Sequence, residues 1–452
     1  MRIKLKNIGI VEDADIEINS ISVITGVNNS GKSTIGKVLY SLATVQNMAS
    51  DETIVFNKYR SILNELNGIS RWINSSSYRE MYTELRELLF QIERRRDKFS
   101  AWASNENEDP ELETKQSDEM QYLEKKFSEI IEYVDEIAEK DGESKNLSKS
   151  INNLKLRQFR SEEDKIIKIF TLEEILSNEF SGHFVSENSS DGNAFIELIE
   201  DNGDKVNFFV ENRLVNFEKS SFDISREYSE AIYFDDPFLL DDPFSRPMMP
   251  NRVNSHLYSY KHRRNALNQL NKASRMTNFF DKSIQNENIQ SIFSKVLEGE
   301  VKRGSGGYFY YNPNFSSEIG FDSLSAGMKS FSTIQMMMEY GLLNNAEYLI
   351  LDEPETHLHP EWQVRFAELV VLISLHYPIR ILLTSHSPYF IEALDIFSKK
   401  YGIRDDVRFY FSSSKSNLEQ GKVEDVSDNV EVIFKSMYGP LNFLEELRDD
   451  IE

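Results

Sequence analysis

The sequence Gly26-Val27-Asn28-Asn29-Ser30-Gly31-Lys32-Ser33 matches the phosphate-loop pattern G-x-x-x-x-G-K-[ST]. It follows a short β-rich run at residues 21–25 and precedes a segment, residues 34–42, whose apolar residues have helical spacing. A strand, this loop and a helix, in that order, form the context in which the motif binds phosphate. We therefore predict an α/β fold built on a nucleotide-binding sheet.

Each residue type in this loop suits a nucleotide. Glycines let the backbone turn its N–H groups inward, at a helix N-terminus whose dipole favours an anion. We expect Lys32 to hold the β- and γ-phosphates of ATP and the Ser33 hydroxyl to bind Mg²⁺. Further nucleotide contacts are expected from Gly26, Asn28, Asn29, Ser30, Gly31 and Thr34. The alternative is a glycine-rich turn followed by an exposed lysine.

Composition limits the class of protein. Of 452 residues, 40% are hydrophobic and 12% aromatic, which is enough for packed cores. No apolar run is long enough to span a bilayer, so we expect a cytoplasmic protein. The absence of cysteine excludes disulfides, thiolate zinc sites and cysteine nucleophiles. Because the formal charge is −24, any nucleic-acid contact would need a local basic patch or a partner protein.

The phosphate loop belongs to a predicted N-terminal lobe, residues 1–45, that opens with strands at residues 3–5, 8–11 and 14–18. A charged helical insertion follows over residues 46–180. Within it two series of apolar residues recur at alternating steps of three and four: Tyr78, Met81, Leu85, Leu88 and Ile92, then Met120, Leu123, Phe127, Ile130, Val134 and Ile137. They predict either a short antiparallel coiled-coil arm or two amphipathic helices packed on the body.

The middle of the chain predicts a return to the sheet, residues 181–237, and then a lid insertion, residues 238–322. The first part has a β-hairpin pattern over residues 195–217 around Asp201-Asn202-Gly203-Asp204, and a buried strand at residues 231–234. Asp235 and Asp236 then either assist a ligand site at the sheet edge or only shape a turn.

The lid is expected to be helical over residues 247–303, with a hairpin at residues 308–321. Its basic segment, residues 261–264, preceded by Arg252, is the best candidate for nucleic-acid contact in the sequence. In so acidic a chain we favour the alternative, a surface of intramolecular salt bridges.

The C-terminal lobe, residues 323–452, carries the remaining chemistry. Ser325 is a natural N-cap for a helix that starts beside it. The apolar strand at residues 348–351 ends in Asp352, placed to reach Mg²⁺ through water, and Glu353, placed to act as general base on the attacking water. A second β run, residues 379–385, is followed by His386, which could contact the γ-phosphate.

Residues 26–33, 324–328, 351–354 and 384–386 resemble, in order, the Walker A, signature, Walker B and switch-histidine motifs of ABC-type ATPases. The large insertion between the first two motifs resembles the SMC-like and RecF-like branch. The segment Glu353-Pro354-Glu355-Thr356-His357-Leu358-His359-Pro360 resembles the ATPases of prokaryotic anti-phage systems, the OLD, Septu, PARIS and retron-associated group. The sequence departs from the ABC-type pattern in two places. The signature has Ala326 and Met328, and no glutamine matches the Q-loop.

The resemblance implies an ABC-type head with a mixed sheet, ATP and Mg²⁺ as cofactors, and a homodimer across ATP or a higher oligomer. In such a dimer Ser325 and Gly327 of one chain complete the site of the other. The function implied is an ATP-hydrolysing switch that controls a separate effector, a nuclease or toxin, in anti-phage defence. The alternative is a RecF-like or SMC-like DNA-repair clamp, and a non-hydrolytic scaffold is disfavoured by the intact Glu353.

Other functions lack the residues they need. Beyond His386 the sequence predicts one strand, residues 407–411, and two acidic helical pieces, too little for the Toprim nuclease domain of OLD proteins. His357 and His359 could suggest a metal pair, but their place in the family's loop favours structural or dimer-facing roles.

Overall fold

A computed structural model describes residues 1–47, 76–100, 164–225, 230–241, 261–276, 286–304, 307–314, 317–413 and 421–449, most of residues 122–137, and a few positions between 62 and 73. The chain divides into two compact units. The head comprises Met1–Asn47, Ile175–Pro250 and Ser255–Glu452, and the helical unit comprises Met48–Glu174 and Asn251–Asn254. Within the described chain we find no helix with the length and apolar character needed to span a bilayer.

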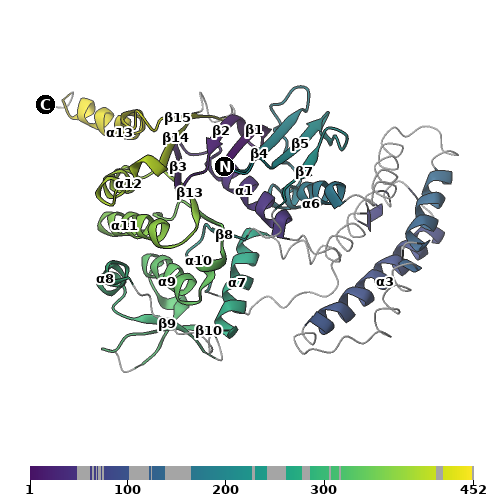
Figure 1. Ribbon diagram of the computed structural model, residues 1–452, viewed down its shortest axis with the longest axis horizontal. Coiled ribbons are helices and arrows are strands. Elements are labelled where there is room, and N and C mark those ends of the chain that lie inside the picture. Colours follow the sequence, from purple (N-terminus) through teal and green to yellow (C-terminus); the bar gives the residue numbers. More distant parts are fainter. Residues whose placement is uncertain are drawn as a thin grey trace. The chain divides into compact units, whose positions relative to one another are not determined.

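The head is built on a 12-stranded mixed sheet with the order β6-β5-β4-β1-β2-β15-β14-β3-β13-β12-β8, and β7 pairs with β5 (Figure 1). Its second half is parallel and consists of β14 (Val407–Ser413), β3 (Ile21–Gly26), β13 (Arg380–Ser385), β12 (Tyr348–Asp352) and β8 (Ala231–Phe234). Helices connect these strands, so the predicted α/β class with a mixed sheet is confirmed.

Helices cover both faces of the parallel half, which explains its continuous apolar strands. On one face, Leu349 and Leu351 of β12 join the core formed with α11 (Pro360–His376) and α12 (Pro388–Lys400). On the other face, Ile350 approaches the backbone of α1 (Lys32–Asn47) at Gly36. This sandwich fixes α1, and with it the phosphate loop, against the strands that carry the other motifs.

The antiparallel half contains β1 (Arg2–Ile8), β2 (Val11–Glu17), β4 (Ala194–Ile199), β5 (Lys205–Glu211), and the short β6 (Leu214–Val215) and β7 (Ser221–Asp223). The predicted hairpin is confirmed, because β4 pairs antiparallel with β5. The strand predicted at residues 8–11 is wrong: the chain turns at residues 9 and 10, where Gly9 has a φ of +56°.

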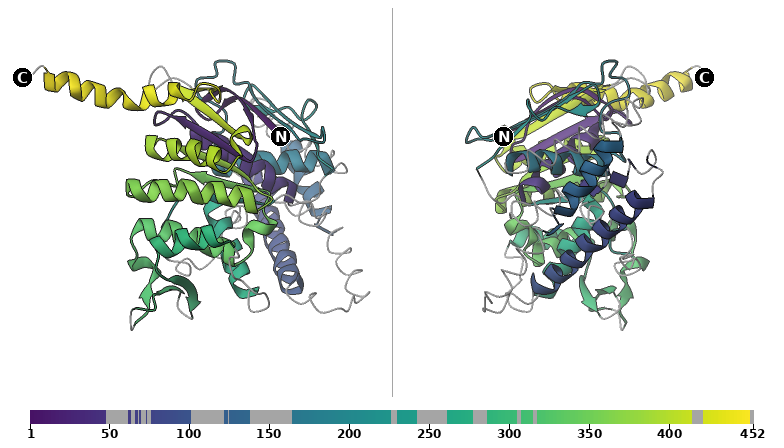
Figure 2. Two further views of the ribbon diagram at one scale, coloured as in Figure 1. Left: turned by 60° about the vertical axis from the view of Figure 1, so that its left-hand side comes forward. Right: turned by 90° about the vertical axis from the view of Figure 1, so that its right-hand side faces the viewer.

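At the C-terminus the predicted strand is confirmed as β14, and a second strand, β15 (Gly421–Asp425), was not predicted. β15 pairs antiparallel with β14 and parallel with β2, so it joins the two halves of the sheet. One helix, α13 (Glu431–Asp449), follows and extends away from the strands (Figure 2).

The predicted lid packs on the head. It contains α7 (His262–Met276), α8 (Glu287–Val296) and a three-stranded sheet of β9 (Glu300–Gly304), β10 (Gly307–Tyr311) and β11 (Ile319–Gly320). The hairpin prediction is confirmed by β10 and β11, whereas residues 300–304 form a strand instead of the expected helix. α9 (Ala326–Glu339) and the short α10 (Leu342–Asn345) follow. Val301, Tyr308 and Tyr310 share one core with Phe331 of α9.

The helical unit has its own core. The two predicted apolar series meet in it, since Tyr78 and Leu85 of α3 (Ser76–Ser100) pack with Phe127 and Val134 of the helix at residues 125–137. Residues 62–73 contribute five further side chains, Ile62, Leu63, Leu66, Ile69 and Ile73, so the core is larger than a two-helix seam. Met120, the side chain of Ile92 and residues 101–118 lie outside the described residues. Another helix, α6 (Asp164–Glu179), leads from this unit into the head.

Candidate nucleotide-binding site

The phosphate loop joins β3 to α1 in a conformation that needs its two framing glycines. Gly26 has a φ of +143° and Gly31 a φ of +98°. A Cβ on Gly26 would lie 2.1 Å from the Ser412 carbonyl oxygen, and one on Gly31 would lie 2.5 Å from Val11. The Ser412 hydroxyl also donates to the Ser30 carbonyl at 2.7 Å. The C-terminal end of β14 and the first residue of β2 therefore pack closely against the loop backbone, a contact that the sequence did not predict.

The other loop residues differ in exposure. Asn28 and Asn29 are exposed, and Asn29 adopts a left-handed φ of +60°. Ser30 and Thr34 are buried. The loop thus presents the two asparagines to solvent and keeps the first turn of α1 packed in the head.

Lys32 is buried beneath the loop, with 4% of its surface exposed. Its Nζ donates to the carbonyl oxygens of Gly26 at 3.1 Å and Val27 at 2.9 Å, and it lies 3.8 Å from Glu353 Oε1. Burial lowers the pKa of Lys32, while the carboxylates of Glu353 and Asp352 oppose that shift. The ammonium group is therefore held at the loop by two backbone carbonyls, with the Glu353 carboxylate nearby.

Asp352 is fixed by three hydroxyl groups. Oδ1 accepts from Ser33 Oγ at 3.0 Å and from Thr384 Oγ1 at 2.5 Å, and Oδ2 accepts from the Tyr233 hydroxyl at 3.0 Å. Burial, reinforced by the Asp352 charge, raises the pKa of Tyr233 well above its usual value, so its hydroxyl stays protonated and donates. The adjacent oxygens of Ser33 and Asp352 are hard ligands of the kind Mg²⁺ prefers, so this donor set fits the metal.

Glu353 lies next to His386. His386 Nδ1 is 3.4 Å from Glu353 Oε1, and this contact lowers the pKa of Glu353 and raises that of His386. Glu353 has a φ of +50°, which is unusual for a residue other than glycine, and its N–H donates to Thr384 Oγ1 at 3.0 Å. Such strained residues cluster at functional sites because the surrounding contacts hold them in place. Glu353 is thus held as an ionised carboxylate at the strand end.

Glu355 supports His386 and was not predicted to belong to the site. Only 2% of its surface is exposed, and its Oε1 accepts from the Ser385 hydroxyl at 2.5 Å and from the His386 N–H at 3.1 Å. Burial raises the pKa of this carboxyl. Glu355 therefore fixes the backbone where β13 ends and His386 begins.

The signature residues lie apart from this cluster. Ser325 caps α9, as predicted, by accepting from the Met328 N–H at 3.3 Å. A Cβ on Gly327 would lie 2.9 Å from the Trp362 ring, so this glycine allows α9 to approach α11 closely. Among the residues that the structure describes, no hydrogen bond or ion pair joins Ser325 or Gly327 to the phosphate loop. The structure brings together the other predicted site residues but leaves these two outside.

The basic segment on α7 is engaged within the chain. His262 Nδ1 lies 2.6 Å from Glu179 Oε2, and its Nε2 lies 3.0 Å from Asp235 Oδ2. Burial would lower the pKa of His262, but the two carboxylates raise it to about 9. Arg263 pairs with Asp235 at 2.9 Å and with Asp236 at 3.1 Å. For His262 and Arg263 the predicted intramolecular salt bridges are confirmed, and Arg252 lies outside the described residues.

His357 and His359 make separate contacts. His359 caps α11 by accepting from the Glu361 N–H at 3.4 Å, and the His357 ring packs at 6.2 Å from that of Phe238. In the described chain no three histidine, aspartate or glutamate side chains are arranged to hold a metal ion.

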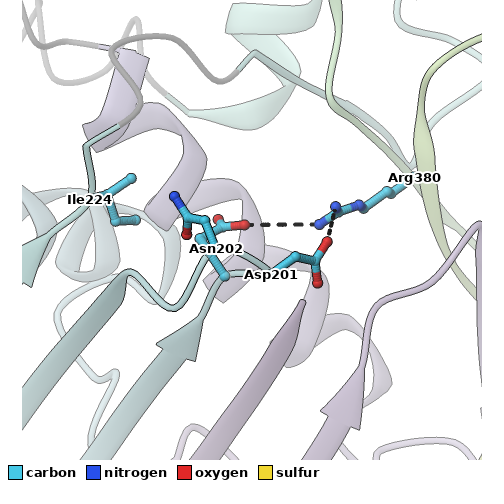
Figure 3. Close-up of a pocket in the computed structure, with 5 residues that line it drawn as sticks. Asp201, Asn202, Ile224 and Arg380 are labelled. Carbon is cyan, nitrogen blue, oxygen red and sulfur yellow. Dashed lines mark hydrogen bonds and ion pairs between the residues drawn. The ribbon is translucent and has the colours of Figure 1, made fainter.

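A small pocket lies at the opposite edge of the sheet, where β13 begins (Figure 3). Arg380 points into it and pairs with Asp201 at 2.6 Å and with Glu200 at 3.9 Å. These contacts connect the β4–β5 hairpin with the parallel strands. Since two carboxylates face one guanidinium, the pocket does not suit a phosphate group.

Comparison with known proteins identifies a matching family and several similar proteins. The model of the AAA ATPase domain family, AAA_15, matches residues 1–391. The Septu protein PtuA of Bacillus thuringiensis is 32% identical over 98 residues, which are 18% of this chain and only 23% of that protein's length. The SMC head domain of Thermotoga maritima aligns with a TM-score of 0.37 at 11% identity, covering 94% of this chain and 98% of that one. A Pyrococcus furiosus Smc head with an extended coiled coil, bound to the C-terminal domain of ScpA, gives a TM-score of 0.32 at 12% identity, with 99% and 98% covered.

Proposed function

Because the chain belongs to the AAA ATPase domain family, AAA_15, we propose that it binds ATP with Mg²⁺ and hydrolyses the ATP to ADP and phosphate. The proposal rests on the contacts among Lys32, Ser33, Asp352, Glu353 and His386 at the carboxyl ends of β3, β12 and β13. Ligands of open α/β sheets bind at this edge. No other part of the described chain combines a phosphate loop with paired acids.

Each residue has a distinct role in the proposed reaction. Lys32 and the loop N–H groups hold the phosphates, and Ser33 and Asp352 hold Mg²⁺, which neutralises phosphate charge and orients the nucleotide. Glu353 accepts a proton from the attacking water while the bond between the γ-phosphorus and ADP breaks. His386, beside Glu353, orients that carboxylate and contacts the γ-phosphate.

We further propose that two chains meet head to tail across ATP. Ser325 and Gly327 stand at the N-terminus of α9, where backbone N–H groups favour an anion. They have no hydrogen bond to their own phosphate loop within the described residues, so they are available to the γ-phosphate bound by a second chain. Neither site would then be complete in one chain.

The proposed purpose of this ATPase is to control a separate effector, a nuclease or toxin, in a prokaryotic anti-phage system. Support comes from the similarity to the Septu protein PtuA, although that match covers a small part of each chain. The helical unit and the lid supply surface beyond what the nucleotide needs. A DNA-clamp function has less support, because His262 and Arg263 of the basic segment already pair with carboxylates.

Coexpression with the proteins encoded beside the gene tests the proposal. We expect a stable complex with one of them and an ATPase rate that does not depend on DNA. A protein that purifies alone, and hydrolyses ATP only when DNA ends are added, would favour the DNA-clamp function instead.

A further inference from the structure

The Tyr233 hydroxyl is an unexpected partner of the proposed metal ligand. It donates to Asp352 Oδ2 at 3.0 Å, while the two other hydroxyl groups share Oδ1. Tyr233 comes from β8, the strand paired in parallel with β12, where Tyr233 stands opposite Ile350. Ser33 and Thr384 bond only Oδ1, whereas Tyr233 bonds Oδ2. Tyr233 therefore fixes the rotation of the Asp352 carboxylate about its Cβ–Cγ bond.

Tyr233 is itself held by His262. The two rings lie 4.4 Å apart, and Tyr40 of α1 packs edge-on at 6.1 Å from Tyr233 and 6.2 Å from His262. All three side chains are buried. The rings of Tyr40 and His262 pack on Tyr233 and restrict its rotation.

His262 is in turn fixed by a carboxylate at the end of α6. Glu179 is the last residue of α6, and it binds both the His262 N–H, at 3.0 Å, and the His262 ring. The second ring nitrogen contacts Asp235, directly after β8. The residues of α6 up to Glu174 belong to the helical unit, so this helix connects that unit covalently to the His262 contacts.

We propose that Tyr233 and His262 are positioning residues that tune the affinity of Asp352 for Mg²⁺. Through them this affinity depends on the position of Glu179 at the C-terminal end of α6. The inference rests on the proposed function, since it takes Asp352 as a metal ligand. A displacement at Glu179 shifts His262, frees the Tyr233 ring and releases Oδ2 of Asp352. The end of α6 thereby gains a route to the nucleotide site that does not pass through the phosphate loop.

Tyr233→Phe is the first test, because it removes the hydroxyl and keeps the ring. The measurement is the Mg²⁺ concentration that gives half-maximal binding of a fluorescent ATP analogue. Loss of a hydrogen bond to a metal ligand typically weakens metal binding about 10- to 100-fold, so we expect a shift of about 10-fold or more, with unchanged affinity in EDTA. The matched control is Tyr348→Phe, at the other end of β12, whose hydroxyl binds Glu347 at 3.0 Å.

The proposal would be overturned if Tyr233→Phe, Tyr348→Phe and wild type showed the same Mg²⁺ dependence of nucleotide binding. It would also be overturned if nucleotide binding by the wild type did not depend on Mg²⁺. A wild type that binds the analogue with Mg²⁺ but does not hydrolyse ATP would refute the ATPase function and leave this test intact.

Glu179→Gln tests the remote end of the route. Alone, it should raise the half-saturating Mg²⁺ concentration several-fold, in the same direction as Tyr233→Phe. In the Tyr233→Phe background it should add little, because residues on one route are not additive. Fully additive shifts would show that Glu179 does not act through Tyr233, and no shift from Glu179→Gln in a folded protein would show that His262 and Glu179 serve stability alone; either result would overturn this route.

Discussion

At the scale of single residues, the proposed hydrolysis of ATP requires that the Glu353 carboxyl is ionised. His386 keeps the pKa of this carboxyl below its usual value, so it is ionised and able to accept a proton. We predict that Glu353→Gln still binds ATP but releases phosphate about 10² to 10⁴ times more slowly, because it lacks the base. Phosphate release and nucleotide affinity measure the two effects. Lys32→Ala is the contrasting variant, expected to lose affinity first, and wild-type turnover in Glu353→Gln would refute the assignment.

The protonation of His262 should make the folding stability of the head depend on pH. Its pKa rises from 6.5 to about 9 in the folded head, so its contribution is fully present below pH 6.5 and is lost as the pH passes through about 9. Its charged neighbours are Glu179 and Asp235, with Arg263 on the far side of Asp235. We expect the melting temperature of the wild type to fall across this range. The His262→Gln variant, less stable at neutral pH, should lack that part of the fall; parallel curves would contradict the prediction.

The sequence predicts residues whose role lies in a local motif but misses those whose role depends on strand pairing. Lys32, Ser33, Asp352, Glu353 and His386 follow from motif patterns, and the structure brings them into contact. Tyr233 and Thr384 become partners of Asp352 only because β8 and β13 flank β12 in one register, which no local pattern encodes. Glu355 stands in a quoted motif, but its burial shows only in the fold.

At the scale of elements, the approach of α9 to α11 depends on Gly327. A Cβ there would lie 2.9 Å from Trp362 and 3.2 Å from Leu358. We predict that Gly327→Ala destabilises the head by about 1–3 kcal/mol through overpacking, measured by denaturant unfolding. Trp362→Leu should make room, so the double variant should cost less than the sum of the two single changes. Strict additivity would show that the glycine is needed for another reason.

The elements that we did not predict from the sequence are strands that form because they pair with neighbouring strands. β15 is short and polar, and it is a strand because β14 and β2 offer edges on both sides. β9 likewise completes a small sheet with β10. By contrast, α1 has helical apolar spacing, α9 has the Ser325 cap, and β12 and β13 are apolar runs, and the sequence predicted all four.

At the scale of the whole molecule, the division between head and helical unit follows from composition, because the charged, heptad-like stretch after α1 forms its own core. The third segment of that core, residues 62–73, was not predicted, although Ile62, Leu66, Ile69 and Ile73 recur at steps of four, three and four. The net charge of −24 also belongs to this scale. It opposes nucleic-acid binding by the averaged surface.

Assembly is the central claim at this scale, and one mixing experiment tests it most directly. Lys32→Ala damages the phosphate loop and Ser325→Arg damages the signature helix, so each homodimer should be inactive. A heterodimer of the two variants contains one wild-type composite site, and we predict that mixing restores some ATPase activity. If the chains form heterodimers, verified by differently tagged copies, and the rate stays at the level of the separate variants, the site is completed within one chain and the account is wrong.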